Sequence, residues 1–260
     1  MEIWQAIVLG IVQGVAEFLP ISSSGHLVVL QEIFGMSQAG ITFDIVLHVG
    51  SLCAVFAVFW RDILMLLKNP FQKLTLMLIV GTIPAVLAGY LLRGYMDIFQ
   101  HSFYLAVAFV FTGILLLIAD NIKHVHKSEK EMSVLDAIVI GCMQAIALPP
   151  GISRSGATTT GALVSGLTRE TAARFSFLLS IISIVGAATL ELWEGGYSGV
   201  YMGDIPAYMI GFVVAAVAGY FSIKLLLELI RNCKLKYFAY YVFILAALLL
   251  LEGFVFNFFF

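Results

Sequence analysis

Charged residues are scarce in this chain of 260 residues: Asp, Glu, Lys and Arg together make up 12%, whereas hydrophobic residues make up 61%. The mean hydropathy of +1.02 lies far above that of soluble globular domains. The net charge is −2 and no basic stripe interleaved with aromatic residues occurs, which excludes nucleic acid as a partner. The composition therefore predicts an integral membrane protein.

Cysteine is also rare. Cys53, Cys142 and Cys233 lie far apart, in or beside apolar segments, and form no Cys-x-x-Cys pair or Cys/His cluster. This spacing argues against a thiolate metal site and against a disulfide framework.

Residues 1–20 hold no Lys or Arg and are interrupted by Gln5 and Glu17, unlike the basic start and continuous apolar core of a cleavable signal peptide. We therefore expect the N-terminal segment to remain part of the working protein.

Apolar runs long enough to cross a membrane occur six times. A hydrocarbon core about 30 Å thick requires about 20 apolar residues in a helix. The sequence therefore predicts an all-α, multi-pass membrane protein with six transmembrane helices. These spans are expected at residues 41–60, 74–92, 103–119, 171–192, 206–230 and 237–259.

Two further regions are apolar only at their ends. Residues 1–34 and 134–168 are broken in the middle, at 20–25 and 149–156, by Pro, Ser and Gly. Irregular backbone at membrane depth is tolerated only where protein covers it or where it lines a watery cavity. We predict that both regions are re-entrant helix hairpins.

The chain also contains an internal repeat. When residues 6–25 are aligned without gaps to residues 137–156, ten of the twenty positions are identical. Each repeat, 1–133 and 134–260, then comprises one hairpin and three spans. An odd number of crossings turns the second repeat upside down, and in such inverted-repeat proteins the binding site lies near the bilayer midplane, where the broken elements meet.

Basic residues alternate between the predicted loops. Cytoplasmic loops collect Lys and Arg, and three alternate loops hold nine of the fourteen Lys and Arg residues, whereas the loops between hold only Arg93 in one case and the acidic Glu194 and Asp204 in the other. This pattern predicts a cell-membrane protein with both termini and the first hairpin on the outer side, and the second hairpin on the cytoplasmic side. The basic loop residues are Arg61, Lys68, Lys73, Lys123, Lys127, Lys130, Arg231, Lys234 and Lys236.

Three ionisable residues stand out at membrane depth: Glu17, His26 and Arg154. Such residues cost on the order of 2.5 to 3.5 kcal/mol each to insert, so they are expected to have a function. Arginine fits phosphate oxygens in a bidentate manner, and the backbone N–H groups of a Gly/Ser turn before a helix bind anions. A hydroxyl beside a histidine base would allow phosphoryl transfer, and a carboxylate could hold a divalent cation on diphosphate oxygens.

Purely structural interpretations of the same residues remain open. Glu17 and Arg154 could form a buried ion pair that joins the hairpins. Asp44 and His48 are four residues apart on the first span and more often form a helix–helix contact than a catalytic pair. Some residues of the two turns could serve only close packing: Ser22, Ser24, Gly25 and Gly156.

The segments "QGVAEFLPISSSGH" and "PGISRSGAT" resemble the two signature motifs of the undecaprenyl-diphosphate phosphatase family, also called the bacitracin-resistance phosphatases. The resemblance covers the whole chain. It implies a membrane enzyme that removes the terminal phosphate from a C55 polyprenyl diphosphate and regenerates the monophosphate carrier for cell-wall glycan synthesis. It also implies six spanning helices with two re-entrant pairs, an active site open to the outer face, and a requirement for Mg²⁺ or Ca²⁺.

The same resemblance assigns roles to individual residues. The catalytic residues of the family fall on Glu17, Ser23, His26 and Arg154, and Glu17 is the candidate metal ligand. The family has Glu or Gln at the position of Gln13, and the Gln found here weakens any metal site that needs two carboxylates from this helix. The expected substrate-binding residues are Gln13, Ser22, Ser24, Gly25, Ser153, Ser155, Gly156 and Thr158.

The mechanistic hypothesis is that Arg154 and the backbone amides of the two turns hold the diphosphate, with a cation near Glu17. Ser23, deprotonated with help from His26, would attack the terminal phosphorus. A metal-activated water could act in place of Ser23.

Three other functions compete with this hypothesis. A transporter or flippase for a polyprenyl phosphate would share the inverted repeat and the phosphate site. A lipid phosphatase of the acid-phosphatase superfamily would need a histidine shortly after the Ser-Arg pair, and none occurs between Ser155 and Leu167. A structural scaffold would leave the buried ionisable residues unexplained. The sequence does not determine the preferred polyprenol length, nor whether the protein forms a homodimer.

Overall fold

The computed structural model describes residues 1–36, 40–123, 125–193, 202–231 and 234–253. Within these ranges the protein is helical, with eleven α-helices, one isolated β-bridge and no strand. This confirms the predicted all-α class. Three short 3-10 helices are η1 (Arg93–Gln100), η2 (Glu129–Glu131) and η3 (Met202–Asp204).

Four of the described helices are long and apolar enough to cross a membrane, and each lies at a predicted span. They are therefore consistent with a multi-pass membrane protein. These helices are α5 (Lys73–Leu92), α6 (Ser102–Asn121), α9 (Arg169–Trp193) and α10 (Ile205–Arg231).

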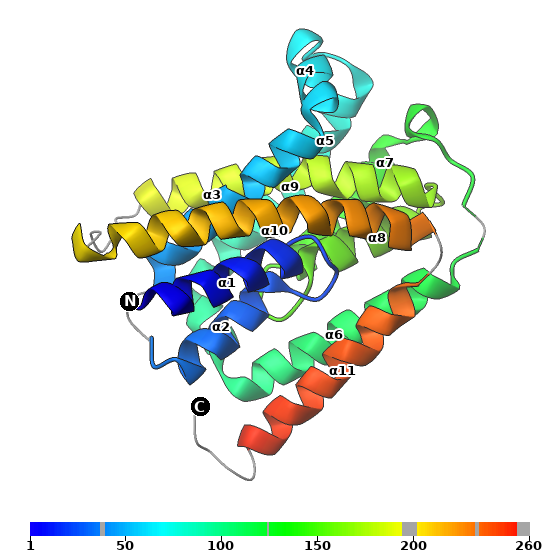
Figure 1. The fold of residues 1–260 in the computed structure, drawn as a ribbon. Coiled ribbons are helices and arrows are strands. Elements are labelled where there is room, and N and C mark those ends of the chain that lie inside the picture. Colours follow the sequence, from blue (N-terminus) through cyan, green and yellow to red (C-terminus); the bar gives the residue numbers. More distant parts are fainter. Residues whose placement is uncertain (37–39, 124, 194–201, 232–233, 254–260) are drawn as a thin grey trace.

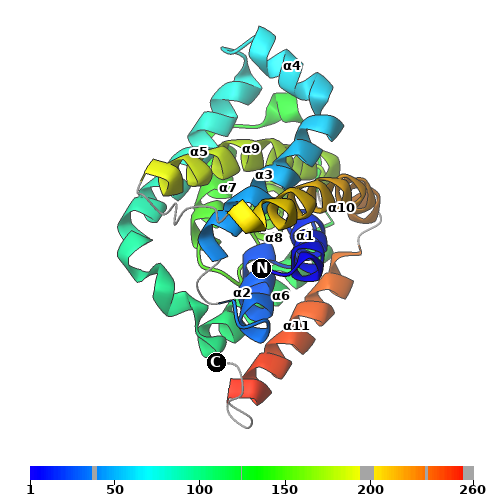
Figure 2. The ribbon, with the colours of Figure 1, turned by 60° about the vertical axis from the view of Figure 1, so that its left-hand side comes forward.

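The span predicted at 41–60 ends earlier than expected. α3 (Gly40–Val58) stops one residue before α4 (Trp60–Lys68), and the two helices are bent by 82° relative to each other. Phe59 leaves the helical region with φ −101° and ψ 25°. The charged residues that follow would be costly inside the bilayer, so the chain turns away, and α4 projects from the bundle (Figures 1 and 2). Counted as one broken span, α3 and α4 form a fifth candidate.

The last predicted span, 237–259, is described only in part. α11 (Leu235–Leu251) covers its first part and packs along α6 (Figure 1). Residues 254–259 lie outside the described residues, as do Cys233 and Glu194.

The two regions predicted to be hairpins each form a pair of short helices joined by a non-helical turn. At 11 to 14 residues, none of the four is long enough to cross a 30 Å core at 1.5 Å per residue. The turns approach each other in the middle of the bundle (Figure 1). The helices are α1 (Ile3–Ala16), α2 (Ser23–Ile33), α7 (Val134–Ile146) and α8 (Arg154–Val164).

Glycines bring these hairpins close to the long helices. α1 packs along α10, and α7 packs along α5. A Cβ on Gly10 would lie 2.8 Å from the carbonyl oxygen of Gly211, and a Cβ on Gly141 would lie 2.4 Å from that of Gly81. Backbones approach this closely only where no side chain intervenes.

Charged contacts tie several loops together at one end of the bundle. Arg174 of α9 pairs with Asp62 of α4 and, at 2.5 Å, with Glu129 of η2. Lys127 lies 3.0 Å from Asp136 at the start of α7. These contacts link elements that are far apart in the sequence, so this end of the bundle is cross-braced.

A stability prediction follows from the glycine packing. Gly141→Ala should lower the stability of the purified protein by about 1–3 kcal/mol, because the added methyl group overpacks the α5–α7 contact. Gly186→Ala on α9 is the matched control, since no heavy atom lies within 4 Å of its added Cβ. Thermal melting in detergent measures the stability of both variants. Equal melting temperatures for Gly141→Ala and Gly186→Ala would contradict the overpacking of the α5–α7 contact.

Candidate functional site

A cavity of about 380 Å³ lies between the two turns, with α3 and α9 forming its other walls. Its polar lining comes from five separate parts of the chain, and its remaining lining is aliphatic. The polar lining residues are Glu17, Ser22, Ser23, Ser24, Asp44, His48, Ser153, Arg154 and Ser183.

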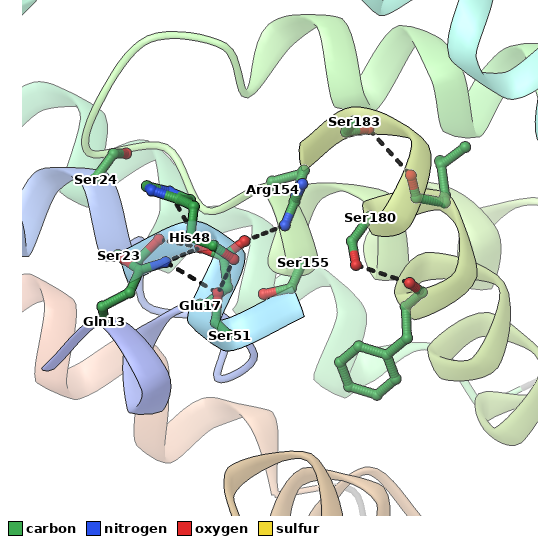
Figure 3. A network of polar contacts seen from close by, with 12 residues as sticks. Gln13, Glu17, Ser23, Ser24, His48, Ser51, Arg154, Ser155, Ser180 and Ser183 are labelled. Carbon is green, nitrogen blue, oxygen red and sulfur yellow. Dashed lines mark hydrogen bonds and ion pairs between the residues drawn. The ribbon is translucent and has the colours of Figure 1, made fainter. Parts of the chain in front are cut away.

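Glu17 lies at the centre of the polar network. Its side chain is 5% exposed, directly after α1. One carboxylate oxygen, Oε1, pairs with Arg154, and the other, Oε2, accepts hydrogen bonds from Ser23 Oγ at 2.5 Å and Gln13 Nε2 at 3.2 Å (Figure 3). The buried negative charge is thus offset by a cation from the opposite hairpin.

Arg154 is the first residue of α8, and its side chain reaches across to the first hairpin. Ser153 caps this helix by accepting the N–H of Gly156 at 3.1 Å, a common N-cap contact. The first hairpin repeats the arrangement, because Ser22 caps α2 by accepting the N–H of Gly25 at 3.4 Å. Two helix N-termini therefore face the same cavity, which favours an anion there.

The two turns touch at a pair of glycines. A Cβ on Gly25 would lie 2.8 Å from the Cα of Gly151 and 2.7 Å from the ring of Phe109. Gly151 has φ +90°, a conformation that side chains rarely adopt. Glycine at both positions allows the contact that brings Ser23 and Arg154 to the same carboxylate.

His26 lies outside the cavity lining. Its Nδ1 lies 2.7 Å from the carbonyl oxygen of Ser22, and its Nε2 lies 2.7 Å from the hydroxyl of Tyr241 on α11. Both ring nitrogens thus have partners other than the hydroxyl of Ser23. The structure brings Ser23 together with Glu17 and does not bring it together with His26.

His48 is the imidazole that faces the cavity. Its Nε2 lies 3.7 Å from Glu17 Oε2, and its Nδ1 lies 2.7 Å from the carbonyl oxygen of Asp44. A carbonyl only accepts, so Nδ1 donates and, in a neutral ring, Nε2 presents its lone pair toward the site. From the sequence alone, His48 and Asp44 were expected to form a helix–helix contact. Their four-residue spacing places them on one face of α3, and both line the cavity.

The remaining predicted binding residues divide into two groups. Ser22, Ser24 and Ser153 line the cavity. The others are buried in the packing around it and do not belong to its lining: Gln13, Gly25, Ser155, Gly156 and Thr158.

Ser183 on α9 is a lining residue that sequence reasoning missed. Its hydroxyl donates to Gln144 Oε1 at 3.1 Å, and Gln144 Nε2 has no hydrogen-bond partner among the described residues. Gln144 occupies in the second hairpin the position that Gln13 occupies in the first. The side chain of Gln13 also has one atom, Oε1, without a hydrogen-bond partner among the described residues. From the sequence alone, Ser183 was one serine within an apolar span, and nothing in that pattern indicated that it lines the cavity.

The side chains around Glu17 do not fit a metal ion held by the protein. Both of its carboxylate oxygens already accept from Arg154, Ser23 and Gln13. The described residues contain no group of three or more His, Cys, Asp or Glu that could hold a metal. This arrangement differs from the expectation of Glu17 as a metal ligand, because Arg154 occupies the place of the cation.

Comparison with known proteins gives the family. Residues 6–248 match the family model described as bacitracin resistance protein BacA. The chain belongs to this family. The resemblance drawn from the two motifs is therefore confirmed.

Relatives in this family match the chain over nearly its full length. An undecaprenyl-diphosphatase of Carboxydothermus hydrogenoformans is 43% identical, over 96% of this chain and 97% of the relative. An undecaprenyl-diphosphatase of Halothermothrix orenii is 39% identical, over 98% of this chain and 100% of the relative. A third, of Rubrobacter xylanophilus, is 40% identical, over 95% and 97%.

The buried pair predicts a strong energetic coupling in this BacA-family protein. Arg154→Met should destabilise the protein by about 3–5 kcal/mol, because it leaves the Glu17 carboxylate buried without a partner. The double variant Glu17→Gln/Arg154→Met should be clearly more stable than Arg154→Met alone. Thermal melting of the four proteins in detergent measures this, and additive losses would show that the two side chains do not interact.

Proposed function

We propose that this protein is an integral membrane phosphatase that hydrolyses undecaprenyl diphosphate to the lipid monophosphate and inorganic phosphate. The observation that carries this proposal is the arrangement around Glu17, where the hydroxyl of Ser23 donates at 2.5 Å and Arg154 pairs with the other oxygen. A nucleophile, a base and a phosphate-binding group thus share one cavity. The names of the full-length relatives, undecaprenyl-diphosphatases, support the substrate.

In the proposed reaction, Ser23 Oγ attacks the terminal phosphorus and gives its proton to Glu17. The bond between that phosphorus and the bridging oxygen breaks, and the lipid monophosphate leaves with the electron pair. Water then attacks the phosphoserine, the bond between phosphorus and the Ser23 oxygen breaks, and that oxygen regains its proton from Glu17. The protons of the water stay on the inorganic phosphate that is released. Arg154 stabilises the charge on the transferring phosphoryl group in both steps.

Glu17 replaces His26 as the proton acceptor in this proposal. The sequence hypothesis gave that role to His26, but the hydrogen bond from Ser23 favours the carboxylate. A water that attacks phosphorus directly is the alternative that still uses Arg154 but not Ser23.

The isoprenoid chain would leave the cavity along its aliphatic wall. That wall is formed by the turn before α8 and by aliphatic residues of α9, so it offers apolar surface beside the phosphate end. A diphosphate bound near Arg154 would place its first isoprene units there. These wall residues are Ala147, Leu148, Ile184, Ala187 and Ala188.

We also propose that the fold is an inverted repeat of six spans and two re-entrant hairpins, with 1–133 and 134–260 as its halves. The matching serine caps of α2 and α8 support this. So do the equivalent glycine contacts of α1 with α10 and of α7 with α5.

The proposed orientation in the cell membrane has both termini outside and the cavity open to the outer face. The alternation of basic loops supports it. The cross-braced end of the bundle, where Arg174 binds Asp62 and Glu129, carries the basic loops and would face the cytoplasm. The reaction would then return the carrier for cell-wall glycan synthesis and contribute to bacitracin resistance.

A transporter for polyprenyl phosphate is the second candidate function, because broken helices near the midplane are typical of transporters. Alternating access would require the cross-braced end to open, so the contacts of Arg174 and Lys127 favour hydrolysis.

The Mg²⁺ or Ca²⁺ requirement remains part of the proposal, with the cation bound by diphosphate oxygens, since no protein site in the described ranges fits it.

The assay that tests this function is phosphate release from undecaprenyl diphosphate by purified protein, with and without EDTA. Ser23→Ala should lower the rate by at least about 10³-fold, because no nucleophile remains. Arg154→Ala should lower it by on the order of 10²–10³-fold. An obligate transporter releases no phosphate.

Ser180→Ala is the matched control for this assay. The Ser180 hydroxyl is buried but donates to the carbonyl oxygen of Phe177 at 2.7 Å, outside the cavity lining, so this variant should stay within roughly threefold of the wild type. A wild-type rate for Ser23→Ala would rule out the serine nucleophile and leave the direct attack by water.

The orientation is tested by cysteine labelling in a variant without native cysteines. An impermeant maleimide should label Tyr95→Cys in intact cells and Lys130→Cys only after permeabilisation. Both positions are exposed, and they lie in loops predicted to face opposite sides. The reverse pattern would invert the proposed topology.

A further inference from the structure

The two turns of the cavity are held from behind by α6 and α11. Among the described residues, neither helix contributes to the cavity lining. The two helices pack against each other (Figure 1), and each reaches one turn through a hydroxyl group.

Thr112 of α6 holds the turn before Arg154. Its side chain is buried, and its hydroxyl donates to the carbonyl oxygen of Gly151 at 2.9 Å while accepting the N–H of Ser153 at 3.0 Å. Gly151 also presses on α6, where its Cβ would lie 2.7 Å from that of Ala108. One hydroxyl thus fixes both ends of the turn whose next residue is Arg154.

Tyr241 of α11 holds the turn before Ser23, acting through His26. The Nδ1 of His26 donates to the carbonyl oxygen of Ser22 at 2.7 Å, so a neutral ring accepts the Tyr241 hydroxyl at Nε2, also at 2.7 Å. Ser22 has φ +70° and is the only described non-glycine residue with positive φ. Such a conformation persists only where its surroundings hold it, and His26 supplies that contact directly before the proposed nucleophile.

We propose that α6 and α11 form one frame that sets the reactive geometry, with Thr112 as a positioning residue for Arg154 and Tyr241, through His26, as a positioning residue for Ser23. The inference rests on the proposed phosphatase function. It gives His26 a positioning role in place of that of a base. Positioning within about 0.5 Å matters for such groups, and a displacement of about 1 Å can cost on the order of 10²-fold in rate.

Thr112→Val tests the first contact, because it keeps the shape of the side chain and removes the hydroxyl. In the undecaprenyl diphosphate assay, kcat/KM should fall by on the order of 10–100-fold, with KM raised and kcat lowered because Arg154 contacts the phosphate before and during transfer. Thr112→Ser keeps the hydroxyl and should recover most of the activity.

Thr160→Val is the matched control. Thr160 is also buried, and its hydroxyl donates to the carbonyl oxygens of Gly156 at 2.7 Å and Leu115 at 3.3 Å. The Thr160→Val variant therefore loses a hydroxyl from the same α6–α8 contact, but away from the turn before Arg154. Its kcat and KM should equal those of the wild type.

Tyr241→Phe tests the second contact, with Tyr240→Phe on the same helix as its control. Because Ser23 acts in the chemical step, kcat should fall by on the order of tenfold while KM stays unchanged. Tyr241 is 44% exposed, so this variant folds and decides the proposal even where Thr112→Val does not accumulate.

Melting temperatures identify any variant that has lost its fold. Wild-type kcat and KM in folded Thr112→Val and Tyr241→Phe would overturn the inference, as would an equal loss in Thr160→Val or Tyr240→Phe. Failure of the wild-type protein itself to release phosphate would instead reject the proposed function.

Discussion

The contact between Glu17 and Arg154 is the constraint on which the rest of the structure depends. Each charge is costly at membrane depth when alone, and the two charges offset each other where the hairpins meet. That meeting requires glycine at both turns, since a Cβ on Gly25 would lie 2.8 Å from the Cα of Gly151. The close packing of α1 and α7 on long helices can be understood as support for one buried pair.

The two hairpins share their scaffold and differ in their chemistry. Ser22 and Ser153 cap their helices in the same way. The next position is Ser23 in the first hairpin and Arg154 in the second, so one turn supplies a hydroxyl where the other supplies a guanidinium. Neither hairpin has the full set of groups alone, which makes the geometry between them decisive for catalysis.

Two histidines make the same local contact but lie in different tertiary surroundings. His26 and His48 each place Nδ1 2.7 Å from the carbonyl oxygen four residues earlier. The other ring nitrogen of His26 meets Tyr241, whereas that of His48 faces Glu17. The motif made His26 the expected base, but helices distant in sequence determine which imidazole reaches the cavity.

The sequence by itself determined the all-helical membrane class, four of the spans, the two broken hairpins and the residues Glu17, Ser23 and Arg154 that meet at the cavity. These follow from hydropathy, from turn residues and from motifs, which are local properties of the chain. Only the tertiary structure decided that Ser23 contacts Glu17, that the chain bends at Phe59 between α3 and α4, and that His48 and Ser183 line the cavity. The physical reason is that these features depend on contacts between helices far apart in sequence, whose distances no local pattern encodes.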